Sequence, residues 1–269
     1  MILEDIRWFV PLAFGAILVG QNWEGRNGPG LSDRVAAALS PNGDVLQFGG
    51  TTQASLSPAS NYYPSQAIGW TWRYGTSGWQ HLQPAVQPPA LYAPMMCYDS
   101  VRGRTVLFGG LPIGLPQVVP KTWEWDGSVW SLVPTSQSPS AVIFGALAFD
   151  AGRGVVVLHG GDANGGPSTS TETWEFDGQQ WQQILTANSP IQAGWGAQPM
   201  AYSPVLGQVV RVVLGPQGTE TWHYDGVDWT QNTAVTGSQP AVSWLTIEPG
   251  GVLLAAGRLP VFGAQNETW

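Results

Sequence analysis

The chain has 269 residues, only 10% of them charged, and its net charge of −8 includes a single lysine, Lys121. This balance provides no basic surface, so we expect no nucleic acid partner. Its one cysteine, Cys97, excludes an internal disulfide or a multi-thiolate metal site, and its apolar neighbours predict a buried structural thiol. The 43% of hydrophobic residues can form a core, while 35 glycines and 22 prolines predict many turns.

Residues 8–20 form an apolar run without a charge. As a helix these thirteen residues would be ~20 Å long, short of the ~30 Å of a bilayer core. The length suits the hydrophobic part of a signal peptide, but residues 4–7 are not a positive leader and no clear cleavage site follows. Three roles therefore stay open for residues 1–20: a membrane anchor or partner-binding arm, a signal sequence, or a segment packed on its own domain. In the arm, the candidate partner-binding residues are Trp8, Phe9 and Phe14.

The most informative feature is a nine-residue motif, TWEWDGSVW at 122–130, that recurs along the chain. Further copies, the first of them looser, lie at 71–79, 173–181 and 221–229, and a fifth begins at Thr268. The leading tryptophans are 51, 51, 48 and 47 residues apart, and in each complete copy a second tryptophan follows by seven. Such a period, built from short strands, is typical of a β-propeller.

Upstream of each motif, two hydrophobic runs are joined by a short turn. The pairs of runs lie at 36–39 and 45–48, 95–98 and 105–108, 146–149 and 155–158, 200–202 and 209–214, and 243–247 and 252–256. Continuous aliphatic runs predict strands buried on both faces. The Asp-Gly pairs in the motifs favour tight hairpins in which both residues take positive φ. Each repeat thus predicts four antiparallel strands, which is one propeller blade.

A hydrophobic strand ending in Gly-Gly, followed by an aromatic strand and then a tryptophan, resembles the kelch motif. The resemblance covers about residues 34–269 and is best where Gly109-Gly110 and Gly160-Gly161 close the second strand. It weakens at Gly215-Pro216 and Gly257-Arg258. It implies that the glycines and aromatics pack blade against blade and permit tight turns, and are not ligands. The blades are expected at about 34–83, 93–133, 144–184, 198–232 and 242–269.

The last repeat lacks an outer strand, and we expect residues 21–25 to supply it. Trp23 precedes Leu39 by 16 residues, close to the 19 to 21 residues that separate the corresponding positions elsewhere. Trp23 would then lie beside Trp269, and closing the ring in one blade removes exposed strand edges. The expected fold is all-β: a five-bladed propeller of kelch-like four-stranded blades over 21–269, closed by an N-terminal strand and preceded by the apolar arm 1–20.

The carboxylates do not predict an active site. They belong to hairpin turns, to first turns or to the outer side of the tryptophan strands: Asp126, Asp177, Asp225; Asp99, Asp150; Glu124, Glu175. A glycosidase needs two carboxylates roughly 5–10 Å apart, and none falls on an inner strand. The histidines His81, His159 and His223 occupy different places in their blades, as satisfied structural residues do. We therefore expect no enzyme, no metal and no cofactor.

The segment that joins the Gly-Gly pair to the Thr-Trp pair is the part of the repeat that varies most in length and sequence. In blade one this segment contains Tyr62 and Tyr63. Variable loops on a rigid scaffold are where binding is usually built. Trp70, Trp195 and Trp244 fall outside the repeat pattern and are candidate partner contacts, although filling gaps between blades is an equal alternative.

The resulting hypothesis is a non-enzymatic interaction or structural subunit, bacterial in style, of a membrane-associated multiprotein complex. It would bind other, membrane-embedded protein subunits through the propeller loops, touch the membrane through residues 1–20, and be extracytoplasmic, in the periplasm or at the cell surface. The alternative is a secreted, lectin-like propeller that binds carbohydrate, which predicts similar shallow pockets in several blades. A five-bladed glycosidase is the least favoured reading.

Overall fold

The computed structural model describes 35–51, 67–112, 120–140, 143–162, 170–192, 199–215, 218–233 and the backbone of 242–247, 253–257 and 267–268. Every regular element in these ranges is a β-strand. The strands form five antiparallel sheets, four with four strands and one with three. Strands that follow one another in the chain are neighbours in the sheet, as the repeat predicts.

The strands of each sheet are consecutive in the sequence. Sheet 1 contains β1 (Ala36–Leu39), β2 (Val45–Phe48), β3 (Thr71–Gly75) and β4 (Gly78–Leu82). Sheet 2 contains β5 (Met95–Asp99), β6 (Arg104–Phe108), β7 (Thr122–Trp125) and β8 (Trp130–Val133). Sheet 3 contains β9 (Ala146–Asp150), β10 (Val155–His159), β11 (Thr173–Phe176) and β12 (Trp181–Ile184). Sheet 4 contains β13 (Met200–Ser203), β14 (Gln208–Gly215), β15 (Gly218–Tyr224) and β16 (Trp229–Asn232), and sheet 5 contains β17 (Val242–Ile247), β18 (Leu253–Gly257) and β19 (Glu267–Thr268).

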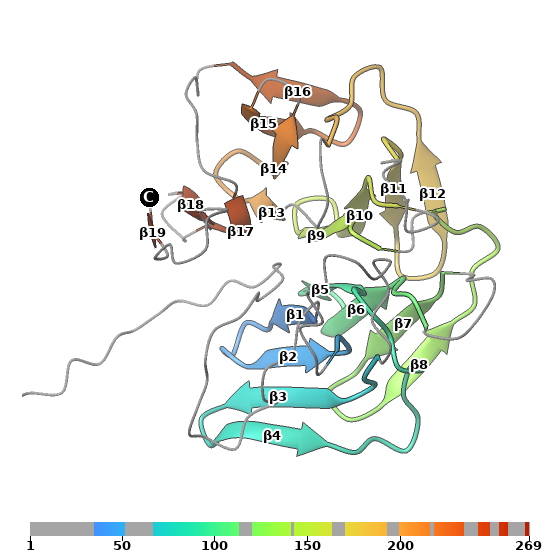
Figure 1. Cartoon of the computed structure of the whole chain (residues 1–269). Coiled ribbons are helices and arrows are strands. Elements are labelled where there is room, and N and C mark those ends of the chain that lie inside the picture. The colour runs from blue at the N-terminus through green and yellow to red at the C-terminus, as the bar shows by residue number, and fades with distance from the viewer. Residues whose placement is uncertain are drawn as a thin grey trace, which may run out of the picture.

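The first strands of the sheets lie side by side around the middle of the molecule (Figure 1). β1 packs beside β5, β5 beside β9, β9 beside β13 and β13 beside β17, while β4, β8, β12 and β16 lie at the periphery. Antiparallel strands alternate in direction, so the connections divide between two faces. One face contains the connections from the second to the third strand of each sheet, and also the joins from one sheet to the next. We call it the loop face. The opposite face, with the turns after the first strands and the hairpins after the third strands, is the turn face.

The core lies between neighbouring sheets. Second strands carry its centre: Val106 and Phe108 on β6, and Val156 and Leu158 on β10, are fully buried. The two residues of β6 pack with the two residues of β10 in one cluster across sheets 2 and 3. This confirms the prediction that these aliphatic runs are buried strands. Cys97 belongs to the same cluster as a free thiol whose pKa is raised by burial, so the expectation of a structural thiol is also confirmed.

The second tryptophan of the motif joins each of sheets 2, 3 and 4 to the sheet before it. Its indole Nε1 donates to the threonine that opens the preceding motif, in the pairs Trp130–Thr71 at 3.0 Å, Trp181–Thr122 at 2.8 Å and Trp229–Thr173 at 2.9 Å. The ring also packs against a phenylalanine of the preceding sheet's second strand, with Trp130 5.4 Å from Phe48 and Trp181 5.0 Å from Phe108 between ring centres. The spacing of the motif therefore fixes how one sheet meets the next.

The hairpin turns differ from the sequence-based expectation. Trp125 and Trp130 face each other across a four-residue loop, in which Gly127 has a φ of 102°. Asp126 does not take positive φ; its Oδ1 instead accepts hydrogen bonds from the backbone N–H groups of Ser128 and Val129 at 2.8 and 2.9 Å. The expectation of two positive-φ residues was wrong because the aspartate side chain closes the turn. In the next two turns the same backbone bonds lower the pKa values of Asp177 and Asp225.

Sheet 5 has three described strands, with β19 paired to β18 through Thr268 opposite Ala256. The expected closing strand at 21–25, the arm 1–20, and both Trp23 and Trp269 lie outside the described residues. The closure of the ring and the number of blades therefore remain predictions.

We expect Thr122→Val to destabilise the protein, because it leaves the buried indole N–H of Trp181 without an acceptor while keeping the shape of the side chain. Such a loss costs roughly 1–3 kcal/mol. Denaturant unfolding would measure it, with Thr230→Val at an exposed position of β16 as the control, expected to change stability by less than about 0.5 kcal/mol. Equal effects of the two changes would contradict the role of the threonine.

Candidate functional site

Of the eight predicted partner-binding residues, Trp70 has a described side chain. Trp244 lies on β17, where the pairing with β18 shifts register between Val242 and Trp244. The remaining six lie outside the described residues: Trp8, Phe9, Phe14, Tyr62, Tyr63 and Trp195. How these residues are arranged relative to one another therefore stays a prediction.

Trp70 stands at the end of the loop-face connection of sheet 1, directly before β3, and is 41% exposed. Its ring meets the edge of the exposed His81 ring, with 5.9 Å between the centres. His81 in turn stacks on Trp72 at 4.7 Å with 26° between the planes. The three rings, which we call the aromatic stack, provide a partly exposed aromatic surface on the outer part of sheet 1.

In sheets 3 and 4 the position of Trp70 is taken by a glutamate. Glu172 and Glu220 each stand two residues before the first tryptophan of the motif and accept a hydrogen bond from its indole Nε1 at 2.9 Å. In sheet 1 the corresponding Nε1, that of Trp72, is buried and has no partner among the described residues. A buried donor without a partner is uncommon and calls for an explanation. Here an acceptor has been replaced by an exposed aromatic ring.

The joins between sheets bring strained backbone to the inner part of the loop face. Ala93 and Phe144 are the non-glycine residues with positive φ in the described chain, at 51° and 60°, and each lies two residues before an innermost strand. The adjoining residues Tyr92 and Ile143 pair with the loops of sheets 2 and 3. Such strain persists where the surrounding contacts dictate the conformation, and it is frequent at binding sites. This part of the loop face is therefore a fixed surface.

A buried polar cluster links sheet 3 to sheet 4. Arg211 on β14 is completely buried, contacts Nδ1 of His159, and donates to the backbone oxygen of His159 at 2.7 Å and to Oε1 of Gln192 at 2.9 Å. Burial lowers the pKa of Arg211 to about 9. His159 also meets the hydroxyl of Ser189 at 2.9 Å, so this histidine is satisfied inside the fold, as expected from the sequence. Arg211 was not predicted from the sequence, although a charged residue within a run of valines was a signal.

On the turn face, an arginine of one sheet reaches over the next. Arg153 donates from Nε to Asp150 at 2.8 Å, pairs with Glu175, and stacks over the Tyr224 ring at 5.2 Å. A Cβ on Gly226 would lie 2.7 Å from Arg153 Nη1, so the guanidinium fills the space beside the hairpin turn.

Arg102 makes the same contacts between sheets 2 and 3. It pairs with Asp99 at 2.6 Å and with Glu124, and lies 5.5 Å from the centre of the Phe176 ring. We call the space that these guanidinium groups fill the arginine seat. The Asp-x-x-Arg spacing in both first turns was the sequence signal for the arginine seat, which was not predicted.

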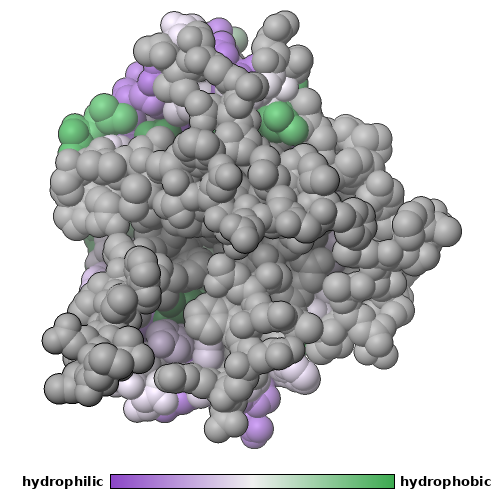
Figure 2. Space-filling model, turned by 60° about the vertical axis from the view of Figure 1, so that its left-hand side comes forward, coloured by the Kyte–Doolittle hydropathy of each residue, from purple (hydrophilic) through white to green (hydrophobic). Residues whose placement is uncertain are grey.

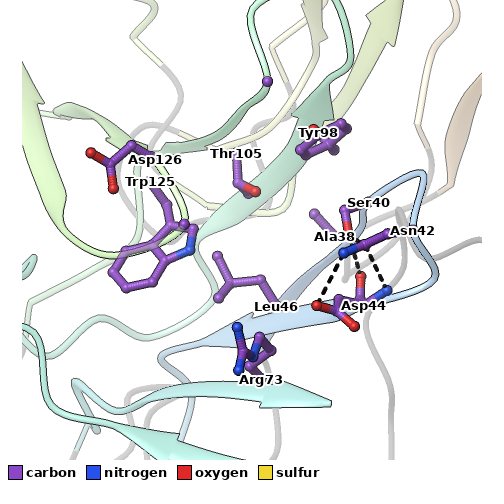
Figure 3. Close-up of a pocket in the computed structure, with 12 residues that line it drawn as sticks. Ala38, Ser40, Asn42, Asp44, Leu46, Arg73, Tyr98, Thr105, Trp125 and Asp126 are labelled. Atoms are coloured by element: carbon purple, nitrogen blue, oxygen red, sulfur yellow. Dashed lines mark hydrogen bonds between the residues drawn. The ribbon is translucent and has the colours of Figure 1, made fainter. Parts of the chain in front are cut away.

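Between sheets 1 and 2 the turn face contains a pocket of about 230 Å³. Its wall includes Ser40 and Arg73 of sheet 1 and Trp125 and Gly127 of sheet 2 (Figure 3). The pocket was not predicted, because it lies between two segments 85 residues apart in sequence, counted from Ser40 to Trp125.

The exposed hydrophobic side chains of the described residues are scattered. Figure 2 shows a few small, separate hydrophobic patches in this view. In the same part of the chain, no group of three or more His, Cys, Asp or Glu side chains is placed to hold a metal ion, and no helix is long and apolar enough to span a bilayer. The aromatic stack and the pocket are therefore the features with the chemistry of binding sites.

No protein-family model matches this chain, and no curated protein is significantly similar to it. Solved structures do match, and one of them is that of YjhT. It superposes with a TM-score of 0.58 over 90% of this chain and 85% of that chain, at 12% sequence identity. This chain has a β-propeller-like, all-β fold. At that identity the likeness concerns the fold alone, and sheets 1 to 4 have the form of propeller blades.

We expect Arg153→Met to lower the free energy of unfolding. The buried Asp150 carboxylate loses its charged partner, and the Tyr224 ring loses the guanidinium stacked over it. Loss of such a bond to a buried charged group costs roughly 1–3 kcal/mol. The control is Arg104→Met, which breaks a 3.4 Å pair with Asp126 at an exposed site and is expected to cost less than about 1 kcal/mol. Denaturant unfolding of both variants measures the difference; if the two losses are equal, the seat has no special role.

Proposed function

We propose that this chain is a non-enzymatic interaction and structural subunit, a kelch-like propeller of five blades that binds a protein partner on its loop face. The observation that carries the proposal is Trp70. It is 41% exposed and occupies the position where two other blades have the glutamate that satisfies a buried indole. A local rule broken at an exposed position, here by a buried indole N–H of Trp72 left without an acceptor, is expected at a functional site.

The surroundings of Trp70 favour a protein partner. Tryptophan is enriched among the residues that dominate binding energy, above all when a rigid neighbourhood holds it in place. His81 contacts Trp70 and is itself stacked on Trp72, and the strained joins at Ala93 and Phe144 hold the inner part of the same face. The expected contacts at Tyr62, Tyr63 and Trp195 lie outside the described residues, and they would enlarge the surface if their loops reach this face.

The placed carboxylates support a non-enzymatic role. Asp150 and Glu175 hold Arg153, and the aspartates of the hairpins close their own turns. A lectin-like propeller with a similar pocket in each blade is less well supported, because arginines fill two of the three described seats between neighbouring blades.

We further propose that the ring closes between sheet 5 and sheet 1. Trp79 is the blade-one counterpart of Trp130, Trp181 and Trp229, and its buried Nε1 has no acceptor among the described residues. The threonine that opens the preceding motif would be Thr268 on β19. Residues 21–25 would then add the fourth strand to that blade. The apolar residues 1–20 would hold the propeller at a membrane or against an embedded subunit, in an extracytoplasmic compartment.

The test is the isolation of the tagged, full-length protein from membranes of its source cells in mild detergent. We expect a stoichiometric complex with at least one other protein, and Trp70→Glu to abolish it. The same change should raise the stability of the isolated chain by roughly 1 kcal/mol, because the glutamate restores the acceptor for Trp72 Nε1.

Trp70→Ala serves as the matched variant: it removes the ring without supplying an acceptor, so we expect loss of the partner and no gain in stability. Mass spectrometry of the same preparation would show whether residues 1–20 are retained. A soluble monomer without these residues, or a complex unaffected by either change at Trp70, would contradict the proposal.

A further inference from the structure

The pocket between blades 1 and 2 is an arginine seat without its arginine. Ser40 corresponds to Asp150, since each accepts the backbone N–H of the glycine that ends its turn. Arg73 corresponds to Glu175, because each lies opposite the central residue of its second strand, Leu46 or Val157. Both Ser40 and Arg73 line the pocket.

The other half of the seat comes from blade 2. Trp125 corresponds to the stacked rings of Phe176 and Tyr224, and Gly127 to the glycines beside the guanidinium groups. A Cβ added to Gly178 would lie 2.6 Å from an arginine atom, whereas one added to Gly127 would meet no atom within 4 Å. The space that a guanidinium fills at the other two contacts is therefore open here.

The missing side chain follows from the turn between β1 and β2. Five residues separate the pair Leu39–Val45, whereas six separate the corresponding pair Tyr98–Thr105, and the shorter turn contains no arginine. The two carboxylates that hold the guanidinium are replaced as well, one by the hydroxyl of Ser40 and one by the cation of Arg73. The seat between sheets 1 and 2 therefore differs from the other two in the residues that line it, and not only in the absence of an arginine side chain.

The charges around the pocket balance. Arg73 and Asp44 line it directly, and Asp126, also in the wall, pairs with Arg104 at 3.4 Å. A guanidinium or ammonium group would meet Arg73 where the filled seats offer a glutamate. An anion would meet Asp44 and Asp126. Two cations against two anions leave no net charge to be matched, so the lining favours a neutral ligand.

The hydrogen-bonding groups alternate with apolar surface. The Ser40 hydroxyl and the Asn42 amide donate within their own turn, to Asn42 Oδ1 and Asp44 Oδ2, and one Arg73 nitrogen donates to Gln80. The other N–H groups of Arg73 can still donate to a ligand, and the oxygens of Asp44 and Ser40 can accept. In Figure 3, Ser40, Asn42 and Asp44 gather on one side and the Trp125 ring lies on the other, across Leu46 and Thr105. Trp125 is itself 5% exposed, so the lining suits a small ligand that has hydroxyl groups around its rim and an apolar C–H face that reaches the accessible part of the indole.

We propose that this seat binds one ring of a neutral hexose. Its volume of about 230 Å³ is below the roughly 300–1,000 Å³ of sites for larger ligands, which limits the occupant to a single small ring. The site lies on the turn face, opposite the aromatic stack, and the inference does not depend on the partner proposed for Trp70.

The experiment is an NMR titration of the full chain, labelled with ¹⁵N, by the methyl glycosides of glucose, galactose and mannose. We expect at least one to bind with a dissociation constant of about 1 mM and to shift the indole resonance of Trp125, which Trp125→Phe identifies. Arg73→Gln and Asp44→Asn should each weaken binding by about tenfold, the loss of one hydrogen bond to a charged group.

Lys121→Gln is the matched control, because it removes a positive charge at an exposed position outside the pocket wall, and binding should persist. The melting temperature of each variant reports whether it is folded. Binding of methylguanidinium or acetate in preference to every glycoside would overturn the neutral-ligand inference. The absence of any shift at Trp125 with all three glycosides up to ~50 mM, about fifty times the expected constant, would overturn it as well.

Discussion

The hydrogen bond from a buried tryptophan of one sheet to the first threonine of the motif in the sheet before it is the constraint on which this structure depends. In sheets 1 to 4 the second strands are buried, and the clusters that join sheet 1 to sheet 2 and sheet 2 to sheet 3 contain side chains of both partners, so these sheets depend on their neighbours for a core. The large indole supplies apolar area for that contact, and its N–H must find an acceptor once it is buried. The pairs Trp130–Thr71, Trp181–Thr122 and Trp229–Thr173 meet both demands at once, and they fix the period of the repeat.

Because these pairs fix how the sheets pack together, other positions of the repeat can differ from blade to blade. The differences locate the candidate sites. Blades 3 and 4 have a glutamate before the first tryptophan, whereas blade 1 has the exposed Trp70. Arg102 and Arg153 fill the seats on the turn face, whereas the seat between blades 1 and 2 is open. Both departures fall on blade 1, one on each face. In a repeat protein, comparing equivalent positions of the blades thus identifies the residues that depart from the repeat.

The sequence predicted the fold well, because periodicity and burial are local properties. The runs at 36–39 and 45–48 are strands with those bounds, and the others differ by one or two residues where the structure describes them. Among the predicted partner contacts, the structure describes the side chain of Trp70, which was selected because it breaks the repeat pattern, and its role as a contact stays a prediction. The pocket was missed because it forms between blades: nothing near Ser40 in the sequence indicates that Trp125 will lie opposite it. The turns were misread because the Asp126 side chain, and not a second positive φ, closes the loop.

The central claim is that one tryptophan–threonine contact joins every blade to the next and also closes the ring. The most direct measurement is the indole N–H spectrum of Thr268→Val, with Thr122→Val recorded beside it. If the ring closes as proposed, the Trp79 resonance moves in the first variant as the Trp181 resonance moves in the second, because each indole loses its acceptor. A Trp79 resonance unchanged by Thr268→Val, while Trp181 responds to Thr122→Val, would show that sheet 5 does not meet sheet 1 through this contact.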